Sequence, residues 1–302
     1  MARKRAAEGR DGILLVDKPA GWTSHDVVAK VRRLVGQPRA GHAGTLDPFA
    51  TGLLVVCLGQ ATRLAGYVMA HEKVYEGEIV LGVTTDTADC DGTVIARRPV
   101  PPVDTVTLER VAGLFTGVIA QAPPAYSAVK VAGQRAYDLA RQGKAVELTA
   151  RPVEVFELRL TPIGADRLRI HVRCGPGTYI RSLARDIGEA LGCGAHLASL
   201  RRLRSGRFRV EDAWAIPELE RLAGEGRAGE AMLPADEALL DHDCAILGTP
   251  GREAFLHGNV HSAGTAVRPA AAARVYGTDG AFLGVGAVDA SGRVQPVRVF
   301  RA

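Results

Sequence analysis

The chain has 302 residues, of which 47% are hydrophobic and 24% are charged, a composition that excludes a disordered chain and a single small module. Its net charge of +5 is mild and is weak evidence for a polyanionic partner. No stretch approaches the roughly 18 uninterrupted apolar residues of a membrane span, and no apolar segment follows the basic N-terminus as in a signal peptide. We therefore expect a cytoplasmic protein without a membrane segment.

The first third of the chain predicts two strands and a helix. Residues 13–16 are continuously apolar and predict a short buried strand. A helix is predicted to begin near Thr23 or Ser24, because apolar residues then recur at helical spacing, and to end at Gly36. Residues 75–81 alternate in the manner of a second strand, with Tyr75 at its start.

Residues 167–174 carry the clearest strand signal in the chain. Apolar side chains alternate there with three arginines and a histidine, which predicts one apolar and one basic face. The Gly-Pro-Gly-Thr run that follows predicts a turn, with Thr178 as the N-cap of a helix that ends at Gly192. On this helix Arg181 and Arg185 are predicted to share an exposed face.

The remaining segments indicate how the chain is divided. Residues 122–151 combine a Pro-Pro pair with a polar helix candidate around residues 134–143, and we interpret them as an excursion from a sheet. Beyond about residue 235, short apolar runs separated by glycine and proline predict a small β-barrel-like domain. The predicted organisation is a flexible basic leader (1–11), a large sheet-centred domain (12–235) with the excursion (122–151), and a small β-rich domain (236–302).

Five arginines are clustered late in the large domain, within nine residues that hold no acid. Such a run could neutralise several phosphates and would make nucleic-acid binding dependent on salt. The alternative is a solvated arginine face with no ligand. The arginines are Arg201, Arg202, Arg204, Arg207 and Arg209.

The run from residue 41 to residue 54 places one carboxylate, Asp47, among glycine, proline and small hydroxyl residues. Pro48 restrains the residue before it to extended geometry, and glycines permit positive φ or close backbone approach. The loop could therefore hold Asp47 in one defined position for chemistry. An ordinary turn rich in Asp, Pro and Gly is the alternative. The glycines in question are Gly41, Gly44 and Gly52.

The sequence contains no complete motif for a metal or cofactor site. Asp86, Asp89 and Asp91 precede a glycine, but their register does not fit a calcium loop. His257 and His261 have i, i+4 spacing without the acidic base of a metalloprotease. Five cysteines without a Cys-x-x-Cys argue against a disulfide framework or zinc finger, and no Walker loop, nucleophile elbow or dinucleotide motif occurs. We expect no metal and no cofactor.

Several segments, in one order along the chain, resemble motifs of the TruB family of tRNA pseudouridine synthases. Together they cover most of residues 12–210. They are Lys18-Pro19-Ala20-Gly21-Trp22-Thr23-Ser24, the Gly44-Thr45-Leu46-Asp47-Pro48 loop, the Thr-Asp-Thr-x-Asp-x-Asp-Gly stretch at 85–92, Pro123-Pro124-Ala125-Tyr126-Ser127-Ala128-Val129-Lys130, the Gly-Thr-Tyr-Ile-Arg run at 177–181, and Gly192 through Arg202.

The resemblance implies an α+β pseudouridine synthase fold with a central mixed, mainly antiparallel sheet flanked by helices and loops, plus a small C-terminal β-barrel-like PUA domain. It implies that Asp47 is the nucleophile, that Arg181 pairs with Asp47, and that Tyr75 stacks on the target base. Residues implied to bind the substrate are His42, which occupies the space that a flipped base leaves, and Tyr179, Leu200, Asp89, Lys18, Lys130 and Arg202.

The implied reaction converts uridine to pseudouridine at position 55 of tRNA, in the T-loop, and needs no cofactor. Asp47 could attack either the sugar C1′ or the base C6. The implied partner is the T-arm of tRNA, bound by a monomer without an obligate protein partner. The excursion at 122–151, with Lys130, Arg135, Arg141 and Lys144, is predicted to act as a thumb that clamps the RNA loop.

Two alternatives remain open at the level of sequence. The first is a related enzyme for another RNA, such as a guide-dependent pseudouridylase of the dyskerin type. That type carries long basic extensions, whereas this sequence has a short basic leader. The second is a tRNA-folding chaperone, a role that could also accompany catalysis. The combination of Asp47, Tyr75 and Arg181 argues against binding alone.

Overall fold

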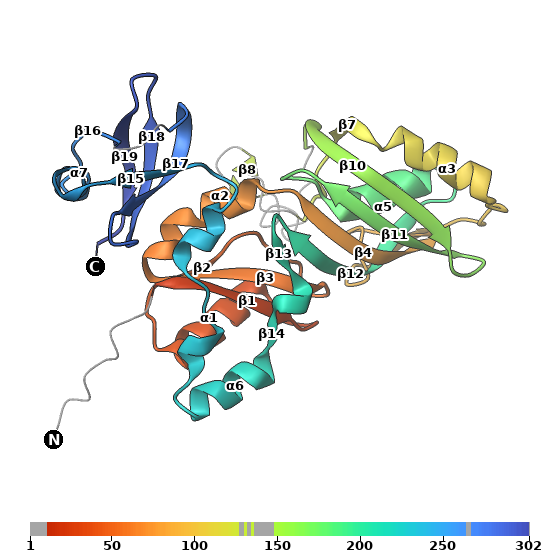
Figure 1. The fold of residues 1–302 in the computed structure, drawn as a ribbon. Helices are drawn as coiled ribbons and strands as arrows, with labels where there is room; N and C mark the ends of the chain where they lie inside the picture. Colours follow the sequence, from red (N-terminus) through yellow and green to blue (C-terminus); the bar gives the residue numbers. More distant parts are fainter. Residues whose placement is uncertain (1–10, 127–129, 132–133, 136–147, 264–266, 302) are drawn as a thin grey trace.

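The structure, a computed structural model, describes residues 11–126, 130–131, 134–135, 148–263 and 267–301. Two sheets dominate it: a ten-stranded sheet built from the large domain and a five-stranded sheet near the C-terminus (Figure 1). Within the described ranges, no helix is long and apolar enough to cross a membrane.

The large sheet runs in the order β14-β1-β3-β12-β4-β11-β10-β7, with β2 added to β3 and β13 to β12. Its neighbours are antiparallel except for the pairs β1–β14 and β3–β12. The predicted mixed, mainly antiparallel sheet is therefore confirmed. Its strands are β1 (Gly12–Lys18), β2 (Ala40–His42), β3 (Thr51–Leu58), β4 (Lys73–Leu81), β7 (Gly117–Gln121), β10 (Arg151–Pro162), β11 (Arg167–Cys174), β12 (Ala195–Ser205), β13 (Phe208–Arg209) and β14 (Trp214–Ala215).

Helices cover the two halves of this sheet differently. Helices α1 (Ser24–Val35) and α6 (Ile216–Gly224) pack on one face of β1 and β3, while α2 (Ala65–Ala70) and the 3-10 helices η1 (Gly59–Leu64) and η4 (Ala235–Leu239) pack on the other. Helices α3 (Thr105–Leu114) and α5 (Ile180–Ala190) cover one face of β4, β11 and β10. The 3-10 turn η3 (Ala228–Ala231) lies beside α6, and η2 (Val210–Asp212) contacts β1 and β12. Strand β5 (Val83–Thr85) pairs with β6 (Val94–Arg97).

This difference explains the sequence patterns. Strands β1 and β3 are almost continuously apolar because both of their faces are buried. Strands β4 and β11 alternate because their second face is open to solvent. The strands predicted at 13–16, 75–81 and 167–174 and the helix predicted after Thr23 are all present, with Thr23 as N-cap and Gly36 as C-cap at φ 70°.

Two predictions about the second half of the large domain were wrong in part. Tyr179, not Thr178, is the N-cap of α5, because the Thr178 hydroxyl donates to the Gly175 carbonyl at 3.1 Å instead of capping the helix. The exposed face predicted for Arg181 and Arg185 does not exist, since Arg181 is only 6% exposed and Arg185 is half-buried. Helical spacing alone could not show that loops from elsewhere cover this face.

The excursion at 122–151 is described only in part. Strand β8 (Lys130–Val131) pairs with β9 (Gln134–Arg135), so a short hairpin stands where the predicted helix was to begin. Residues 136–147 lie outside the described residues, as do the side chains of both short strands. The thumb hypothesis is therefore untested by the structure.

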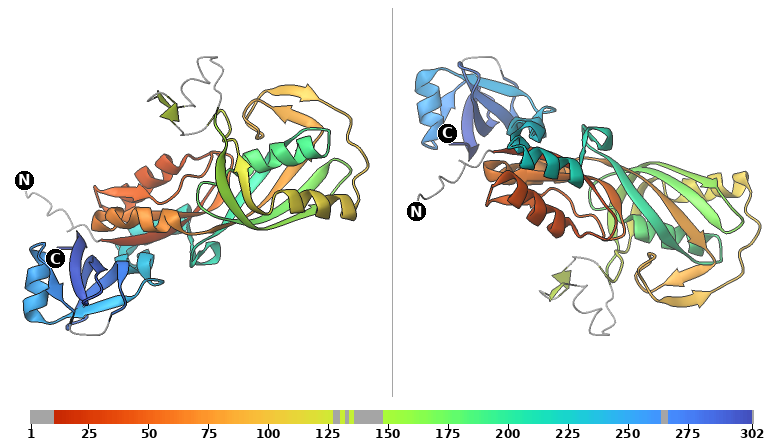
Figure 2. Two further views of the ribbon diagram at one scale, coloured as in Figure 1. Left: turned by 90° about the horizontal axis from the view of Figure 1, so that it is seen from above. Right: turned by 90° about the horizontal axis from the view of Figure 1, so that it is seen from below.

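The C-terminal sheet has the order β15-β17-β18-β19-β16 and confirms the small β-rich unit. Figures 1 and 2 show it beside the β1–β3 half, at the opposite end of the molecule from α3. Val285 and Phe300 are buried in the same apolar cluster as Ile13 and Leu53 of the large sheet. The exact boundary at residue 235 stays a prediction. The elements are β15 (Cys244–Leu247), α7 (Thr249–Leu256), β16 (His261–Ser262), β17 (Ala270–Gly277), β18 (Phe282–Val288) and β19 (Arg293–Val299).

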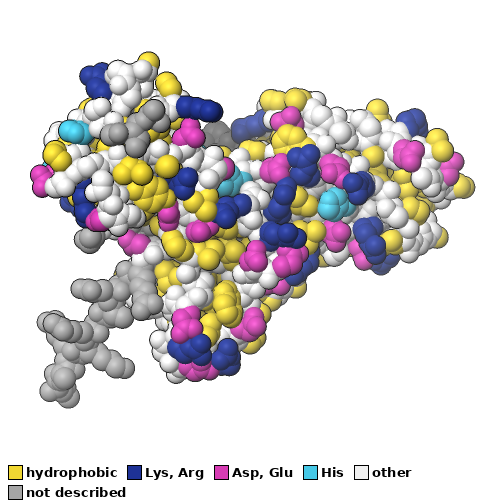
Figure 3. Space-filling view, viewed as in Figure 1, with side chains coloured by type: hydrophobic (Ala, Val, Ile, Leu, Met, Phe, Trp, Pro, Cys, Tyr) yellow, Lys and Arg dark blue, Asp and Glu magenta, His cyan; other side chains and the backbone are white. Residues whose placement is uncertain are grey.

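The clustered arginines are not a free basic surface. Four of the five form ion pairs with a carboxylate, and Figure 3 shows Lys and Arg next to Asp and Glu across the open face of the sheet. Because these charges are already neutralised, the cluster supports phosphate binding less than its sequence suggested. The pairs are Arg201 with Asp17 at 2.7 Å, Arg204 with Glu72, Arg207 with Glu237 at 2.5 Å and Arg209 with Glu211 at 3.2 Å.

Candidate active site

Asp47 lies in the loop between β2 and β3, and the first residue of α1 and the turn before it hold the backbone on both sides of Asp47. The Ser24 hydroxyl accepts a hydrogen bond from the Leu46 amide at 2.9 Å and donates one to the Leu46 carbonyl at 3.1 Å. The Gly21 amide donates to the Pro48 carbonyl at 2.9 Å. The two motifs at 18–24 and 44–48 are therefore parts of one structure.

Lys18 supports the same loop from inside the protein. Its side chain is fully buried, and the ammonium donates to the carbonyls of Pro48 at 3.1 Å, Trp22 at 2.6 Å and Pro19 at 2.9 Å. Burial lowers the pKa of Lys18 to about 8. Lys18 does not line the cleft described below, so the structure places it under the loop and not against a substrate.

Lys18→Met is expected to lower the free energy of unfolding by about 3 kcal/mol, because three carbonyls lose a buried donor. Denaturant titration of both proteins measures the difference. Lys30→Met is the matched control, since Lys30 is partly exposed and, within the described ranges, forms an ion pair with Glu220 alone at the surface. Equal stability of the two variants would show that the Lys18 contacts do not hold the loop.

Arg202 fastens the loop to β12. It is 1% exposed, and its guanidinium donates to the carbonyls of Leu53 at 2.7 Å and Gly44 at 3.1 Å. Gly52, at φ 96°, lies so close to β12 that a Cβ atom would meet the Arg202 carbonyl oxygen at 2.4 Å. Gly44 also has positive φ, at 115°, whereas Gly41 does not. The glycine-rich composition thus serves both backbone conformation and close packing.

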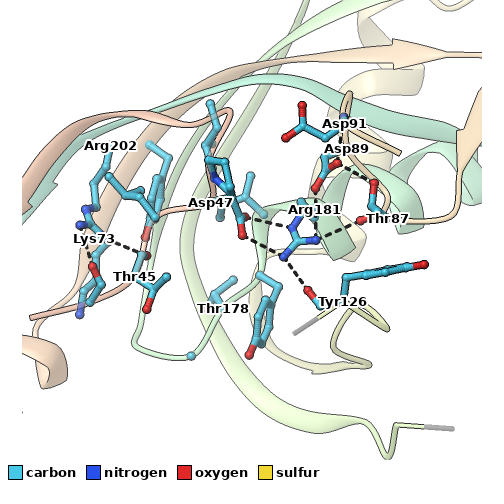
Figure 4. A pocket seen from close by; sticks show the side chains of 18 of the residues that line it. Thr45, Asp47, Lys73, Thr87, Asp89, Asp91, Tyr126, Thr178, Arg181 and Arg202 are labelled. Atoms are coloured by element: carbon cyan, nitrogen blue, oxygen red, sulfur yellow. Dashed lines mark hydrogen bonds and ion pairs between the residues drawn. The ribbon is translucent and has the colours of Figure 1, made fainter. Parts of the chain in front are cut away.

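Asp47 is paired with Arg181, which projects from the first turn of α5 (Figure 4). Arg181 Nη2 donates to Asp47 Oδ1 at 3.0 Å, and Arg181 Nε lies 3.0 Å from Asp47 Oδ2. Arg181 Nη1 lies 3.2 Å from Asp89 Oδ2, so one guanidinium contacts two carboxylates. This side-on geometry fixes the direction of the Asp47 carboxylate.

Backbone carbonyls complete the surroundings of Arg181. It donates to the carbonyls of Thr87 at 3.1 Å and Tyr126 at 3.0 Å. Asp89 in turn accepts from the Thr87 hydroxyl at 2.6 Å and from the Asp91 amide at 3.1 Å. Within the acidic stretch at 86–91, Asp89 and the Thr87 carbonyl therefore position Arg181.

The environment raises the pKa of Asp47 above its usual value of 3.8. Burial is the largest cause and the neighbouring Asp89 adds to it, while the Arg181 guanidinium opposes both. The Asp47 side chain nevertheless keeps 32% of its surface exposed, against 7% for Arg181. A carboxylate that is oriented, partly desolvated and still accessible is suited to act as a nucleophile.

Asp47 opens onto a cleft of about 780 Å³. The cleft is also lined by Arg181, Tyr75, Tyr179, Leu200 and Asp89, so positions far apart in the sequence converge there. Tyr75 is 9% exposed, and burial raises the pKa of its hydroxyl. The cleft is large enough for one nucleotide and its neighbours.

His42 lies at the end of β2, just before the loop, and is not part of the cleft lining. Its ring meets that of His25 edge to face at a centroid distance of 5.4 Å. Burial lowers the pKa of His42, and His25 and Arg202 lower it further. Nδ1 of His42 is buried and has no hydrogen-bond partner among the described residues.

The predicted site differs from the observed one in a few members. The side chain of Lys130 lies outside the described residues, and Arg202 reaches the cleft but is committed to loop carbonyls. Sequence reasoning missed Lys73, Thr87 and Ser24. The motif at 18–24 contains the Thr-Ser pair at the start of α1, so Ser24 could have been proposed from the sequence. No motif or spacing in the sequence indicated a role for Lys73. Among the described residues, no group of His, Cys, Asp and Glu could hold a metal ion.

Three family models match most of the chain. Residues 32–180 match the model of the TruB family pseudouridylate synthase N-terminal domain, residues 181–240 that of a tRNA pseudouridylate synthase B C-terminal domain, and residues 247–300 that of the pseudouridine synthase II TruB C-terminus.

Two relatives are similar over nearly their whole length. The tRNA pseudouridine synthase B of Chromohalobacter salexigens is 44% identical, covering 99% of this chain and 97% of its own. That of Thermobifida fusca is 46% identical, covering 96% and 98%.

A solved structure of an H/ACA RNP bound to a substrate RNA matches with a TM-score of 0.72 at 24% identity, over 96% of this chain and 85% of its own, which supports the fold alone. Domain models and relatives together show that the chain belongs to the TruB family of pseudouridine synthases.

Proposed function

We propose that this protein isomerises uridine to pseudouridine at position 55 of tRNA, in the T-loop, with Asp47 as the nucleophile. The observation that carries the proposal is the Asp47 carboxylate, held side-on by Arg181 and 32% exposed at a cleft that also presents Tyr75 and Leu200. The names of the two bacterial relatives support tRNA as the substrate.

The reaction requires no group donor and no change of oxidation state. The bond between uracil N1 and ribose C1′ breaks, the base turns, C5 bonds to C1′, and the C5 proton is lost while N1 gains one. Asp47 contributes a carboxylate that forms a covalent bond either to C1′ or to C6. Arg181 keeps this carboxylate oriented throughout, and Tyr75 lines the cleft beside it.

A T-loop uridine reaches the cleft only after it leaves its stack, which requires a few kcal/mol from protein contacts. His42 lies beside the catalytic loop, where its ring could occupy the space that the base vacates. The enzyme is proposed to act in the cytoplasm as a monomer, without an obligate protein partner; light scattering of the purified protein tests the monomer.

The rate of the first turnover is expected to fall as the pH drops, with a midpoint above the ordinary aspartate pKa of 3.8. The folded-state pKa of Asp47 is raised, so the ionised nucleophile is lost on acidification at a higher pH than for a free aspartate. Single-turnover rates between pH 4 and 7.5 measure this acid limb. A rate that stays constant down to pH 4 would contradict a raised pKa at the nucleophile.

Tritium release from a tRNA transcript labelled at uridine C5, followed by mapping of the modified position, tests the function. Release at the T-loop uridine alone is the expected result. Release at another position would redirect the proposal to a different RNA target. Tight tRNA binding without any release would instead favour the chaperone role.

A further inference from the structure

Two buried cations stand on the side of the cleft opposite Arg181. Figure 4 shows Lys73 and Arg202 to one side of Asp47, and Arg181 with Asp89 to the other. Lys73 begins β4, is 6% exposed and lines the cleft, as does Arg202. Arg202 is directly opposite Tyr75 in the pairing of β12 with β4.

The cations on the two sides of the cleft differ in whether a carboxylate neutralises them. Arg181 contacts two carboxylates, Asp47 and Asp89. Among the described residues, neither Lys73 nor Arg202 forms an ion pair; both donate to backbone carbonyls instead. Lys73 Nζ donates to Met69 at 2.5 Å and to His71 at 2.6 Å, which accounts for two of its three N–H groups.

Burying a cation without a carboxylate partner destabilises the folded state, because carbonyl dipoles replace only part of the hydration energy that the charge loses. Burial, with Arg202 as the next cause, lowers the pKa of Lys73 to about 8. Two cations without carboxylate partners under one wall of the cleft favour the binding of negative charge at that wall. Asp47 does not supply that anion, because Arg181 already holds it.

We propose that Lys73, with Arg202 behind it, forms a cationic subsite that stabilises negative charge on the uracil ring during catalysis. The inference rests on the proposed function. If Asp47 attacks C1′, the electron pair of the broken N1–C1′ bond stays on uracil and spreads to O2 and O4. If Asp47 attacks C6, the pair of the C5–C6 double bond moves towards O4. In both cases the third N–H of Lys73 is available to a ring oxygen.

Charge stabilisation of this kind lowers the barrier without strengthening ground-state binding. Lys73→Met, which keeps an unbranched apolar stem of similar length but removes the ammonium charge, is expected to reduce the single-turnover rate about 100-fold. The tRNA dissociation constant should stay unchanged. Lys73→Arg, which retains the charge, should recover most of the rate. Lys30→Met is the control for loss of a lysine outside the cleft.

The pH dependence of the single-turnover rate distinguishes this role from a structural one, because a lysine that only stabilised the fold would not set the position of the basic limb. The wild-type rate should fall as pH rises through about 8, where Lys73 loses its proton. In Lys73→Arg this basic limb should shift to higher pH, because a guanidinium stays protonated. Lys30→Arg is the matched control, since Lys30 lies at the surface beside Glu220 and does not line the cleft. The groups that face Lys73 are Arg202 of β12, Cys174 of β11 and His71 of the preceding turn.

Each result supports or overturns the inference. A wild-type rate in Lys73→Met, or a basic limb unchanged in Lys73→Arg, overturns it. Weaker tRNA binding at an unchanged rate overturns it as well and assigns Lys73 to an RNA phosphate. If Lys73→Met fails to fold, the Lys73→Arg profile decides. Absence of tritium release from the wild type would reject the proposed function itself, a separate outcome.

Discussion

Asp47→Asn is expected to reduce tritium release by about 10⁴-fold or more, because the amide cannot form the covalent intermediate. The tRNA dissociation constant should stay within about threefold of wild type, since phosphate contacts dominate RNA affinity. The side chain keeps its size, and Arg181 retains Asp89 at 3.2 Å as a partner. Filter binding and single-turnover release on the same preparation separate the two effects.

Asp91→Asn is the matched control for this experiment. Asp91 also lines the cleft, but its carboxylate forms no ion pair within the described part of the chain. It should keep most of the wild-type rate. Loss of binding together with activity in Asp47→Asn, accompanied by a lower melting temperature, would point to a damaged loop. Retained activity would exclude Asp47 as the nucleophile.

Arg181→Met is expected to lower the turnover rate about 10³-fold at neutral pH through misorientation and protonation of Asp47. Arg181 opposes the upward shift of the Asp47 pKa, so its removal raises that pKa further. The acid limb of the rate should therefore move to higher pH, and part of the activity should return on alkalinisation. The free energy of unfolding should fall by about 3 kcal/mol, because two carboxylates lose their cation.

Arg185→Met controls for loss of an arginine on the same helix, since Arg185 pairs with Asp186 and the Ala122 carbonyl away from Asp47. Arg181→Lys keeps the charge without the side-on geometry and should give an intermediate rate with a smaller pH shift. If Arg181→Met loses stability but keeps the wild-type acid limb, the pair serves the fold and not the nucleophile.

Local patterns were sufficient for most of the secondary structure. The alternation at 167–174 matches β11 in both bounds, and Thr23 and Gly36 cap α1 as predicted. These features depend on neighbours within a few residues, which is the range that periodicity and capping report. The N-cap of α5 was misplaced by one residue because Thr178 uses its hydroxyl inside the preceding turn.

Burial of charged residues was not predictable in this way. Arg181 and Arg202 looked like surface cations, yet they are 6% and 1% exposed. Arg181 is buried because Asp47, 134 positions away, and the loop at 86–91 close over it. Lys73 was overlooked for the same reason: a lysine at the start of a strand has no local sign of lying under a cleft.

The sequence by itself determined the elements and the chemical types available: a glycine-rich loop that presents one aspartate, alternating strands, a capped first helix and the motif order of the TruB family. The tertiary structure decided how deeply each charge is buried and, beyond the Arg181–Asp47 pair that the resemblance implied, which charges meet. It directed Arg181 to Asp47 and Asp89, fastened the loop through Lys18 and Arg202, and left Lys73 without a carboxylate beside the cleft. Propensity and capping act between near neighbours in the chain, whereas ion pairing and desolvation depend on distances that only packing sets.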